Sequence, residues 1–145
     1  SRPPSKHFRD TVEEIACKTF ARSFKENSKP FNARPLTAKL TRILWEKAGI
    51  LRDESSLKES IDGIDSVFRE LEGHGASNPL DLFRVFECRN AVLSARAIAV
   101  SALKRTESRG SHYRKDFPKE NEDWLKHIYV RMGRGMPEVS RIVPI

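Results

Sequence analysis

The sequence predicts an all-α protein: a three-helix up-down-up bundle of the spectrin-repeat type, with an extra N-terminal helix and an irregular or short-strand C-terminal extension. Three observations support this fold class. Apolar residues recur at spacings of three and four along successive stretches, which is the pattern of amphipathic helices. Short segments rich in Gly, Asn or Pro separate these stretches, so consecutive helices would run antiparallel. The 145 residues are enough to bury one core.

Residues 1–35 are expected to form an N-terminal helix and a linker. Thr11 and Glu14 have the spacing of a capping box. Pro30 and Pro35 indicate the linker that ends this first region. The helix itself is indicated by apolar residues at helical spacing, namely Phe8, Val12, Ile15, Ala16, Phe20 and Phe24.

Residues 36–110 are expected to form the three-helix bundle. Its first helix should begin near Leu36 and stop at Gly49, with Ile50 making the apolar contact of a Schellman-type ending. The second should start with a capping box of Ser56 and Glu59 and close at residues 73–75. A glycine inside this second helix, at position 63, indicates close packing against a neighbouring helix.

The third helix has the clearest start signal. Asn78 is a favourable N-cap, Pro79 suits the first helical position, and Asp81 is an acid in the first turn. From Leu80 to Leu103 the helix is apolar around much of its girth, so we expect it to be the central and most buried one. Residues 111–145 form the extension, with a short strand predicted over 127–132 and an extended tail over 139–145.

Composition narrows the possible functions. Apolar residues make up 38% and charged residues 32% of the chain, which is typical of a globular domain, and no apolar run is long enough to cross a membrane. Cys17 and Cys88 lack metal-ligand spacing, and the four histidines are scattered, so no metal site is predicted. The net charge of +7 raises the possibility of a nucleic-acid surface, but acidic residues interrupt the basic ones and no stacking motif accompanies them. We therefore expect no nucleic-acid partner and no direct membrane insertion.

Residues 105–118, which we call the charged segment, follow the longest apolar stretch. Gly110 can adopt the positive φ that ends a helix. Two interpretations stay open: the cations bind a carboxylate or phosphate, or they pair internally with the interleaved acids. Near parity of acids and bases favours the internal network, in which Glu107 and Asp116 pair with the cations and a carboxylate can meet the guanidinium of Arg109 once the chain turns at Gly110. The candidate structural and docking residues are Glu107, Ser108, Arg109, Gly110, His112, Arg114 and Asp116.

The charged segment also carries a family resemblance. Its string R-T-E-S-R-G-S-H-Y-R-K-D-F-P, followed by E-D-W-L-K-H at 122–127, resembles the C-terminal domain of succinate dehydrogenase and fumarate reductase flavoprotein subunits. L-aspartate oxidase is a close relative of these proteins. Residues 44–52 are similar to the ending of the family's first helix, and Arg89-Asn90-Ala91 to a signature of its long helix. The resemblance extends from Leu36 to about Val130.

The resemblance implies that the parent protein binds FAD and transfers a hydride between FAD and a dicarboxylate such as succinate or fumarate. The flavin site, the dicarboxylate site and the proton-transfer residues would lie in upstream domains, so no catalytic, cofactor-binding or metal residue is assigned here. This chain alone would be flavin-free and inactive. Its expected partners are the flavin-binding domain, near residues 107–116, and an iron-sulfur subunit. The expected location is cytoplasmic, at the membrane face through partner subunits.

Two alternatives remain open at this point. The chain is also compatible with the C-terminal domain of L-aspartate oxidase, which shares the same string. Outside the flavoprotein class, it is compatible with a stand-alone helical protein-interaction module.

Overall fold

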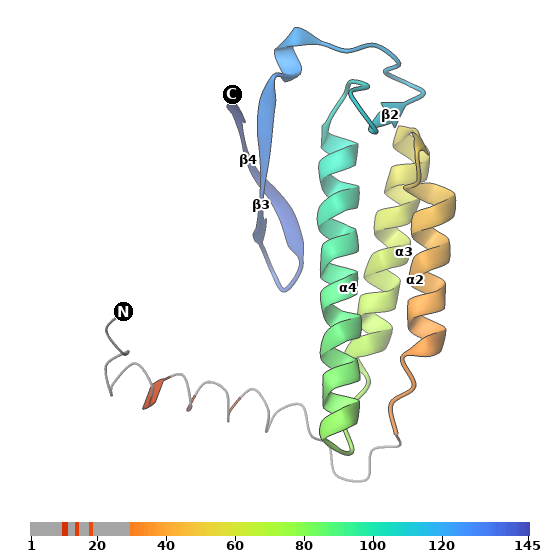
Figure 1. Cartoon of the computed structure of the whole chain (residues 1–145), viewed down its shortest axis with the longest axis vertical. Coiled ribbons are helices and arrows are strands. Elements are labelled where there is room, and N and C mark those ends of the chain that lie inside the picture. Colours follow the sequence, from red (N-terminus) through yellow and green to blue (C-terminus); the bar gives the residue numbers. More distant parts are fainter. Residues whose placement is uncertain (1–9, 12–13, 15–17, 19–29) are drawn as a thin grey trace.

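A computed structural model describes residues 10, 11, 14, 18 and 30–145 of the chain. Within 30–145, three long helices stand side by side: α2 (Arg34–Lys47), α3 (Glu54–Glu72) and α4 (Pro79–Lys104) (Figure 1). Neighbours in the sequence run in opposite directions, as the bundle prediction requires. The N-terminal helix predicted within residues 1–35 falls almost entirely outside the described residues, although the four described there are helical.

The bundle encloses an apolar core to which all three helices contribute. Leu40 of α2, Ile64 and Val67 of α3, and Val92 and Ala99 of α4 are each at most 4% exposed. At Gly63 of α3 an added Cβ would lie 3.1 Å from the Ile43 side chain of α2, which confirms the close packing expected there.

Three helix termini differ from the predictions. Helix α2 begins at Arg34 because Pro35 fits an early helical position, where a missing N–H costs nothing. Its end is not a Schellman motif: Gly49 does not have a positive φ, and Ile50 is 74% exposed. Helix α3 begins at Glu54, earlier than predicted, because the side chain of Asp53 accepts a hydrogen bond from the backbone N–H of Ser56 (2.8 Å). The predicted Ser56 capping box is therefore wrong.

Helix α4 starts as predicted but is less buried than expected. Asn78 is its N-cap and accepts a hydrogen bond from the backbone N–H of Asp81 (3.0 Å). Leu80, Phe83 and Ile98 are 57%, 59% and 53% exposed. Helix α4 is nevertheless the central helix, as expected, because it contacts α2, α3, β3 and β4, although these elements leave its surface open at the three positions.

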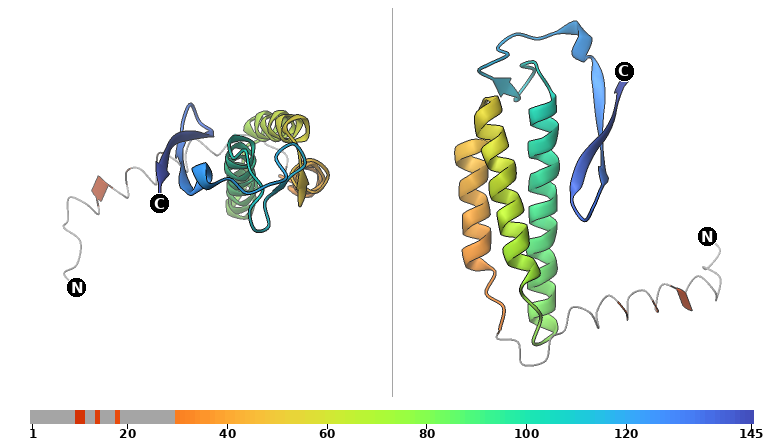
Figure 2. Two further views of the ribbon diagram at one scale, coloured as in Figure 1. Left: turned by 90° about the horizontal axis from the view of Figure 1, so that it is seen from above. Right: turned by 180° about the vertical axis from the view of Figure 1, so that it is seen from behind.

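The fold is mostly helical but not all-α. Strand β1 (Leu51–Arg52) pairs in parallel with β2 (Tyr113–Arg114) at one end of the bundle. After the short 3-10 helix η1 (Glu122–Trp124), β3 (Lys126–Met132) and β4 (Pro137–Pro144) form an antiparallel hairpin. Figures 1 and 2 show this hairpin along α4, on the side away from α2.

The C-terminal tail is extended, as expected, and it forms the second strand of the hairpin. The predicted strand over 127–132 is confirmed, and the tail folds back to pair with it because residues 133–136 make a tight turn, with Gly135 at φ 86°. Apolar side chains of both strands can then pack towards α4. Among the helices of the described part of the chain, none is long and apolar enough to cross a membrane.

Candidate functional site

The charged segment crosses the end of the bundle and buries two ionised side chains. Glu107 is 0% exposed and Arg114 is 1% exposed. Buried ions are costly unless charged and hydrogen-bonding partners surround them. The contacts of these two residues therefore define the candidate site.

Glu107 is held by two guanidinium groups and one backbone amide. The Nε of Arg109 donates to both carboxylate oxygens (3.1 Å each), and Nη1 of Arg105 donates to Oε1 (2.5 Å). The backbone N–H of Asn121 donates to Oε2 (3.0 Å). Burial alone would raise the pKa of Glu107, but the hydrogen bonds from Arg109, the Asn121 amide and Arg105 together lower it to about 2. Glu107 is thus an anion that joins the end of α4 to the loop before η1.

Arg114 closes the C-terminal end of α4. Its Nη1 donates to the carbonyl oxygens of Ala102, Leu103 and Arg105, each at 3.1 Å. The last carbonyls of a helix have no partner within the helix, so a buried guanidinium is a suitable donor for them. The guanidinium also lies 5.0 Å from the centre of the Phe117 ring.

Asp116 balances the charge of Arg114 in a bidentate pair. The distances are 2.7 Å from Nε to Oδ1 and 2.5 Å from Nη2 to Oδ2. Oδ2 also accepts the backbone N–H of Glu54 (3.0 Å), at the start of α3. The bonds from Arg114 lower the pKa of Asp116 to about 2 despite partial burial. One ion pair thus connects the end of α4 with the beginning of α3.

Ser108 and Gly110 shape the backbone between these ion pairs. The Oγ of Ser108 accepts the N–H of Arg114 (2.8 Å) and donates to the carbonyl of Phe117 (2.8 Å). Gly110 has the predicted positive φ, at 57°. It does not end α4, however, because it lies in a two-residue turn closed by the reciprocal backbone bonds of Arg109 and His112 (2.8 and 3.0 Å).

Arg109 meets only one of the two acids expected for it. Its guanidinium pairs with Glu107 (3.0 Å) and with Glu120 (3.2 Å), whereas Asp116 pairs with Arg114. Arg114 and Asp116 both follow the turn at Gly110 and are two residues apart, so they pair with each other, while Arg109 lies before the turn. The Arg109 side chain remains 32% exposed.

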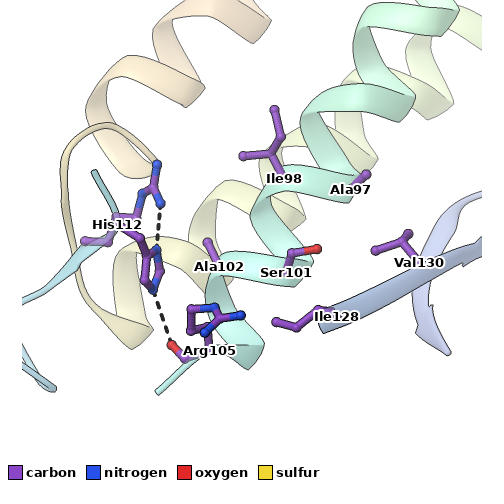
Figure 3. A pocket seen from close by; sticks show the side chains of 9 residues that line it. Ala97, Ile98, Ser101, Ala102, Arg105, His112, Ile128 and Val130 are labelled. Carbon is purple, nitrogen blue, oxygen red and sulfur yellow. Dashed lines mark hydrogen bonds between the residues drawn. The ribbon is translucent and has the colours of Figure 1, made fainter. Parts of the chain in front are cut away.

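His112 lies at the edge of this network, next to a distant part of the chain. Its Nδ1 is 2.7 Å from Nη1 of Arg52, and its Nε2 is 3.4 Å from the carbonyl oxygen of Arg105 (Figure 3). An arginine can only donate, so Nδ1 is the acceptor and the ring proton is on Nε2. Burial lowers the pKa of His112, and the charges of Arg52, Arg114 and Arg105 act in the same direction, although the contact with the Arg105 carbonyl raises it. His112 is therefore neutral near pH 7.

The side chains of the charged segment are engaged with one another and with the backbone. Every buried side-chain nitrogen and oxygen of the described residues has a hydrogen-bond partner. The same part of the chain contains no group of three His, Cys, Asp or Glu placed to hold a metal. Cys88 is buried, and burial raises the pKa of its thiol.

Sequence reasoning missed three participants of the site. Arg105 is close in sequence to the predicted residues, and its guanidinium lies over the Trp124 ring, 5.3 Å from the ring centre. The spacing of Arg105 and Trp124 in the sequence did not indicate this contact. Asn121 contributes through its backbone, which no side-chain pattern indicates. Arg52 precedes His112 by 60 residues and is brought there by the pairing of β1 with β2.

Comparison with known proteins agrees with the resemblance carried by the charged segment. Residues 37–141 match the family model described as "Fumarate reductase flavoprotein C-term". An uncharacterized FAD-dependent oxidoreductase of Methanocaldococcus jannaschii is 36% identical over 100 residues, which are 69% of this chain and 19% of that protein. L-aspartate oxidase of Pyrococcus abyssi is 38% identical over 94 residues, which are 63% of this chain and 16% of that protein.

A solved structure gives the same result for the fold. The Mycobacterium smegmatis Sdh1 complex in its apo form contains a chain that matches with a TM-score of 0.77 at 26% identity. The match covers 99% of this chain and 25% of that one. This chain spans less than a fifth of the length of either sequence relative. Because the family model covers most of its residues, the chain belongs to the fumarate reductase flavoprotein C-terminal family.

Proposed function

We propose that this chain is the helical C-terminal domain of an FAD-dependent flavoprotein subunit of the succinate dehydrogenase or fumarate reductase type. In this proposal the whole protein transfers a hydride between FAD and a dicarboxylate, and this domain packs on the flavin-binding domain and on an iron-sulfur subunit. Partner subunits would bring it to a membrane face. The observation that carries the proposal is the family match over residues 37–141.

The geometry of the charged segment favours a structural role over a catalytic one. Its two buried ions are engaged by other groups of the same chain, at distances that leave no substrate position between them. In our proposal Glu107, Ser108, Arg109, Gly110, His112, Arg114 and Asp116 form a structural and docking network. Residues 1–35 would lead from the flavin-binding domain, residues 36–110 would form the bundle, and residues 111–145 its extension.

Exposed apolar side chains near the same end of the bundle support docking. Trp45 is 83%, Ile50 is 74% and Leu51 is 61% exposed. Leu51 pairs with Tyr113 of the charged segment, so these side chains adjoin the network. Exposed aromatic and aliphatic side chains gathered in one region indicate a protein interface. We propose that the flavin-binding domain covers this region.

The test is to produce the chain alone and together with a flavin-binding domain that lacks its own C-terminal domain. Alone, the chain should carry no flavin absorbance and should not reduce a dye with succinate. With the flavin-binding domain it should co-elute in size-exclusion chromatography. Stoichiometric FAD on the isolated chain, or failure to form any complex, would contradict the proposal.

A matched pair of variants tests the docking region. Trp45→Glu should weaken the complex, because it places a charge among exposed apolar side chains without touching the core. Leu80→Glu is the control. Leu80 is also exposed, but it lies in the first turn of α4, at the end of the bundle opposite to the charged segment. Equal effects of the two substitutions would mean that Trp45 is not part of the interface.

L-aspartate oxidase is the second candidate parent, favoured by the 38% identity over 94 residues. The two parents differ in substrate, so the reconstituted complex should be supplied with succinate and with L-aspartate in parallel. Dye reduction with L-aspartate alone would assign the chain to the second parent.

A further inference from the structure

A cleft of about 490 Å³ lies between the C-terminal half of α4 and strand β3. Ile98 of α4 and Ile128 and Val130 of β3 form apolar walls. At one end the lining changes to cationic and polar groups, namely Arg52, Arg105 and His112. Figure 3 shows Ile98 and the β3 side chains on either side of the space, with His112 and Arg105 closing its end. The cleft thus combines apolar walls with a basic end.

Arg52 differs from the other sheltered arginines of the described residues. Five arginines of the described residues are buried or half-buried. Four of them pair with a carboxylate of this chain: Arg96 with Asp65, Arg105 and Arg109 with Glu107, and Arg114 with Asp116. No carboxylate of the described residues pairs with Arg52. Its Nε donates instead to the carbonyls of Ala48 and Gly49 (3.2 and 2.6 Å), and Nη1 contacts His112.

These contacts satisfy hydrogen bonds of Arg52 but leave its charge uncompensated. Carbonyl oxygens are neutral, and His112 accepts through an unprotonated Nδ1. Arg105, the other cation of the cleft, is already paired with Glu107. A half-buried guanidinium is stabilised by an anion, and its planar set of donors fits a carboxylate or phosphate in a bidentate manner. The basic end of the cleft can therefore bind an anion, and the described part of the chain supplies none for Arg52.

The shape of the cleft distinguishes between kinds of anion. Ile98 is 53% exposed, so the apolar wall is open to solvent and does not enclose a small molecule. A free carboxylate or phosphate would contact only the basic end and would leave Ile98, Ile128 and Val130 uncovered. A polypeptide segment can fill both parts at once, with an acidic side chain at Arg52 and aliphatic neighbours against the walls.

We propose that this cleft is a docking site for a partner polypeptide segment in which one Asp or Glu lies between aliphatic residues. The carboxylate takes the open side of Arg52, and the aliphatic side chains cover Ile98, Ile128 and Val130. The partner is defined by charge and apolar complementarity to the cleft. The inference rests on Arg52 and the cleft alone, so it does not depend on which enzyme is the parent.

The test uses capped tripeptides, acetyl-Leu-Glu-Leu-amide and acetyl-Leu-Gln-Leu-amide, titrated into the 145-residue chain and followed by NMR. The Arg52 Nε–H and the Ile98 methyl resonances should shift together and saturably with the Glu peptide. The Gln peptide should bind about tenfold more weakly, because one charge-assisted contact is lost. Equal binding of the two peptides, or no shift at either residue, would overturn the proposal.

Two substitutions and a control locate the binding. Arg52→Gln should remove the preference for Glu over Gln. Arg89→Gln should retain it, because Arg89 also lacks a carboxylate partner among the described residues but is exposed and lies outside the cleft. If Arg52→Gln fails to fold, Ile98→Asp tests from an exposed position whether the peptide binds in the cleft. It should weaken binding of the Glu peptide more than binding of the Gln peptide, because the new carboxylate repels the Glu side chain.

Acetate and inorganic phosphate serve as the small-anion arm of the titration. Both should bind Arg52 much more weakly than the Glu peptide and should leave the Ile98 methyl groups unshifted. Acetate or phosphate binding as tight as that of the peptide would assign the cleft to a small anion and overturn docking.

Discussion

The interior of the bundle and the charged segment are both buried, but opposite kinds of side chain fill them. Between the helices, Leu57, Ile64 and Val92 are 0% exposed and contact other apolar groups. At the end of the bundle, the equally buried Glu107 and Arg114 contact ions and backbone atoms. Apolar packing is tolerant because a slightly altered side chain loses only part of its contacts. An ion pair is less tolerant, because removing one member leaves the charge of the other without compensation.

The largest expected effect comes from Arg114→Met, which keeps much of the side-chain volume and removes the charge. The change leaves Asp116 without its partner and removes the Arg114 donor from three carbonyls at the end of α4, of which that of Arg105 keeps its contact with Nε2 of His112. We expect the free energy of unfolding to fall by about 3 to 5 kcal/mol, the usual cost of breaking a buried pair. Urea denaturation of the 145-residue chain measures it.

The matched control for Arg114→Met is Arg131→Met. Arg131 also pairs with a carboxylate, that of Glu138 at 3.0 Å, but its side chain is 69% exposed. Exposed pairs contribute about 0 to 1 kcal/mol. Similar losses in the two variants would mean that burial of the Arg114 pair has no energetic consequence.

Acid should destabilise the charged segment next most strongly. In the folded protein the pKa values of Glu107 and Asp116 are held at about 2, below their ordinary values of 4.5 and 3.8. Because the folded values are the lower ones, the unfolded chain binds more protons, and stability falls as pH decreases. The contribution is complete above about pH 5 and is lost progressively as the pH falls towards 2.

The measurement is the free energy of unfolding between neutral pH and about pH 3, for the wild type and for Asp116→Asn. The variant should be less stable at neutral pH and should lose less stability on acidification. Parallel curves for the two proteins would show that Asp116 does not titrate with the depressed pKa.

Arg109→Ala should have a smaller effect than Arg114→Met. The Arg109 side chain is 32% exposed, and Glu107 keeps its bonds from Arg105 and from the Asn121 amide after the change. We expect a loss of about 1 to 2 kcal/mol in thermal or urea unfolding. Glu107→Gln should overlap with it in the double variant, since both remove the same contact. Strict additivity would contradict a shared network.

Gly110→Ala should have the smallest effect, about 1 kcal/mol. Gly110 has φ 57°, and an added Cβ would meet nothing within 4 Å, so the cost comes from the backbone conformation alone. Gly110→Asn is the control, because Asn adopts this conformation more readily than Ala. A neutral Gly110→Ala variant would mean that the turn relaxes without cost.

The two regions also differ in how well the sequence predicts them. Apolar spacing predicts the three helices, and Asn78 with Pro79 predicts the start of α4, because these signals act between residues close in the chain. The exposure of Leu80, Phe83 and Ile98 depends on which elements cover α4 and is not encoded locally. The all-α prediction overlooked the β3–β4 hairpin because the pairing of 126–132 with 137–144 depends on the turn between them.

For the charged segment, composition identified the participants but not their pairing. Interleaved acids and bases predict some internal network, yet which acid meets which base depends on the path of the backbone. Arg114 pairs with Asp116, two residues further along the chain, whereas Arg109, which precedes the turn at Gly110, pairs with Glu107. The parallel pairing of β1 with β2 brings Arg52 to His112. A contact across 60 residues has no local signal in the sequence.

The central claim is that the ion pair of the buried Arg114 with the partly exposed Asp116, and not a bound ligand, holds the charged segment on the bundle. The most direct test is a double-mutant cycle with Arg114→Met, Asp116→Asn and the double variant, using the free energy of unfolding without added anions. We expect a coupling energy of about 2 kcal/mol or more, because each residue is the other's charge partner. A coupling energy below about 0.5 kcal/mol would contradict the claim.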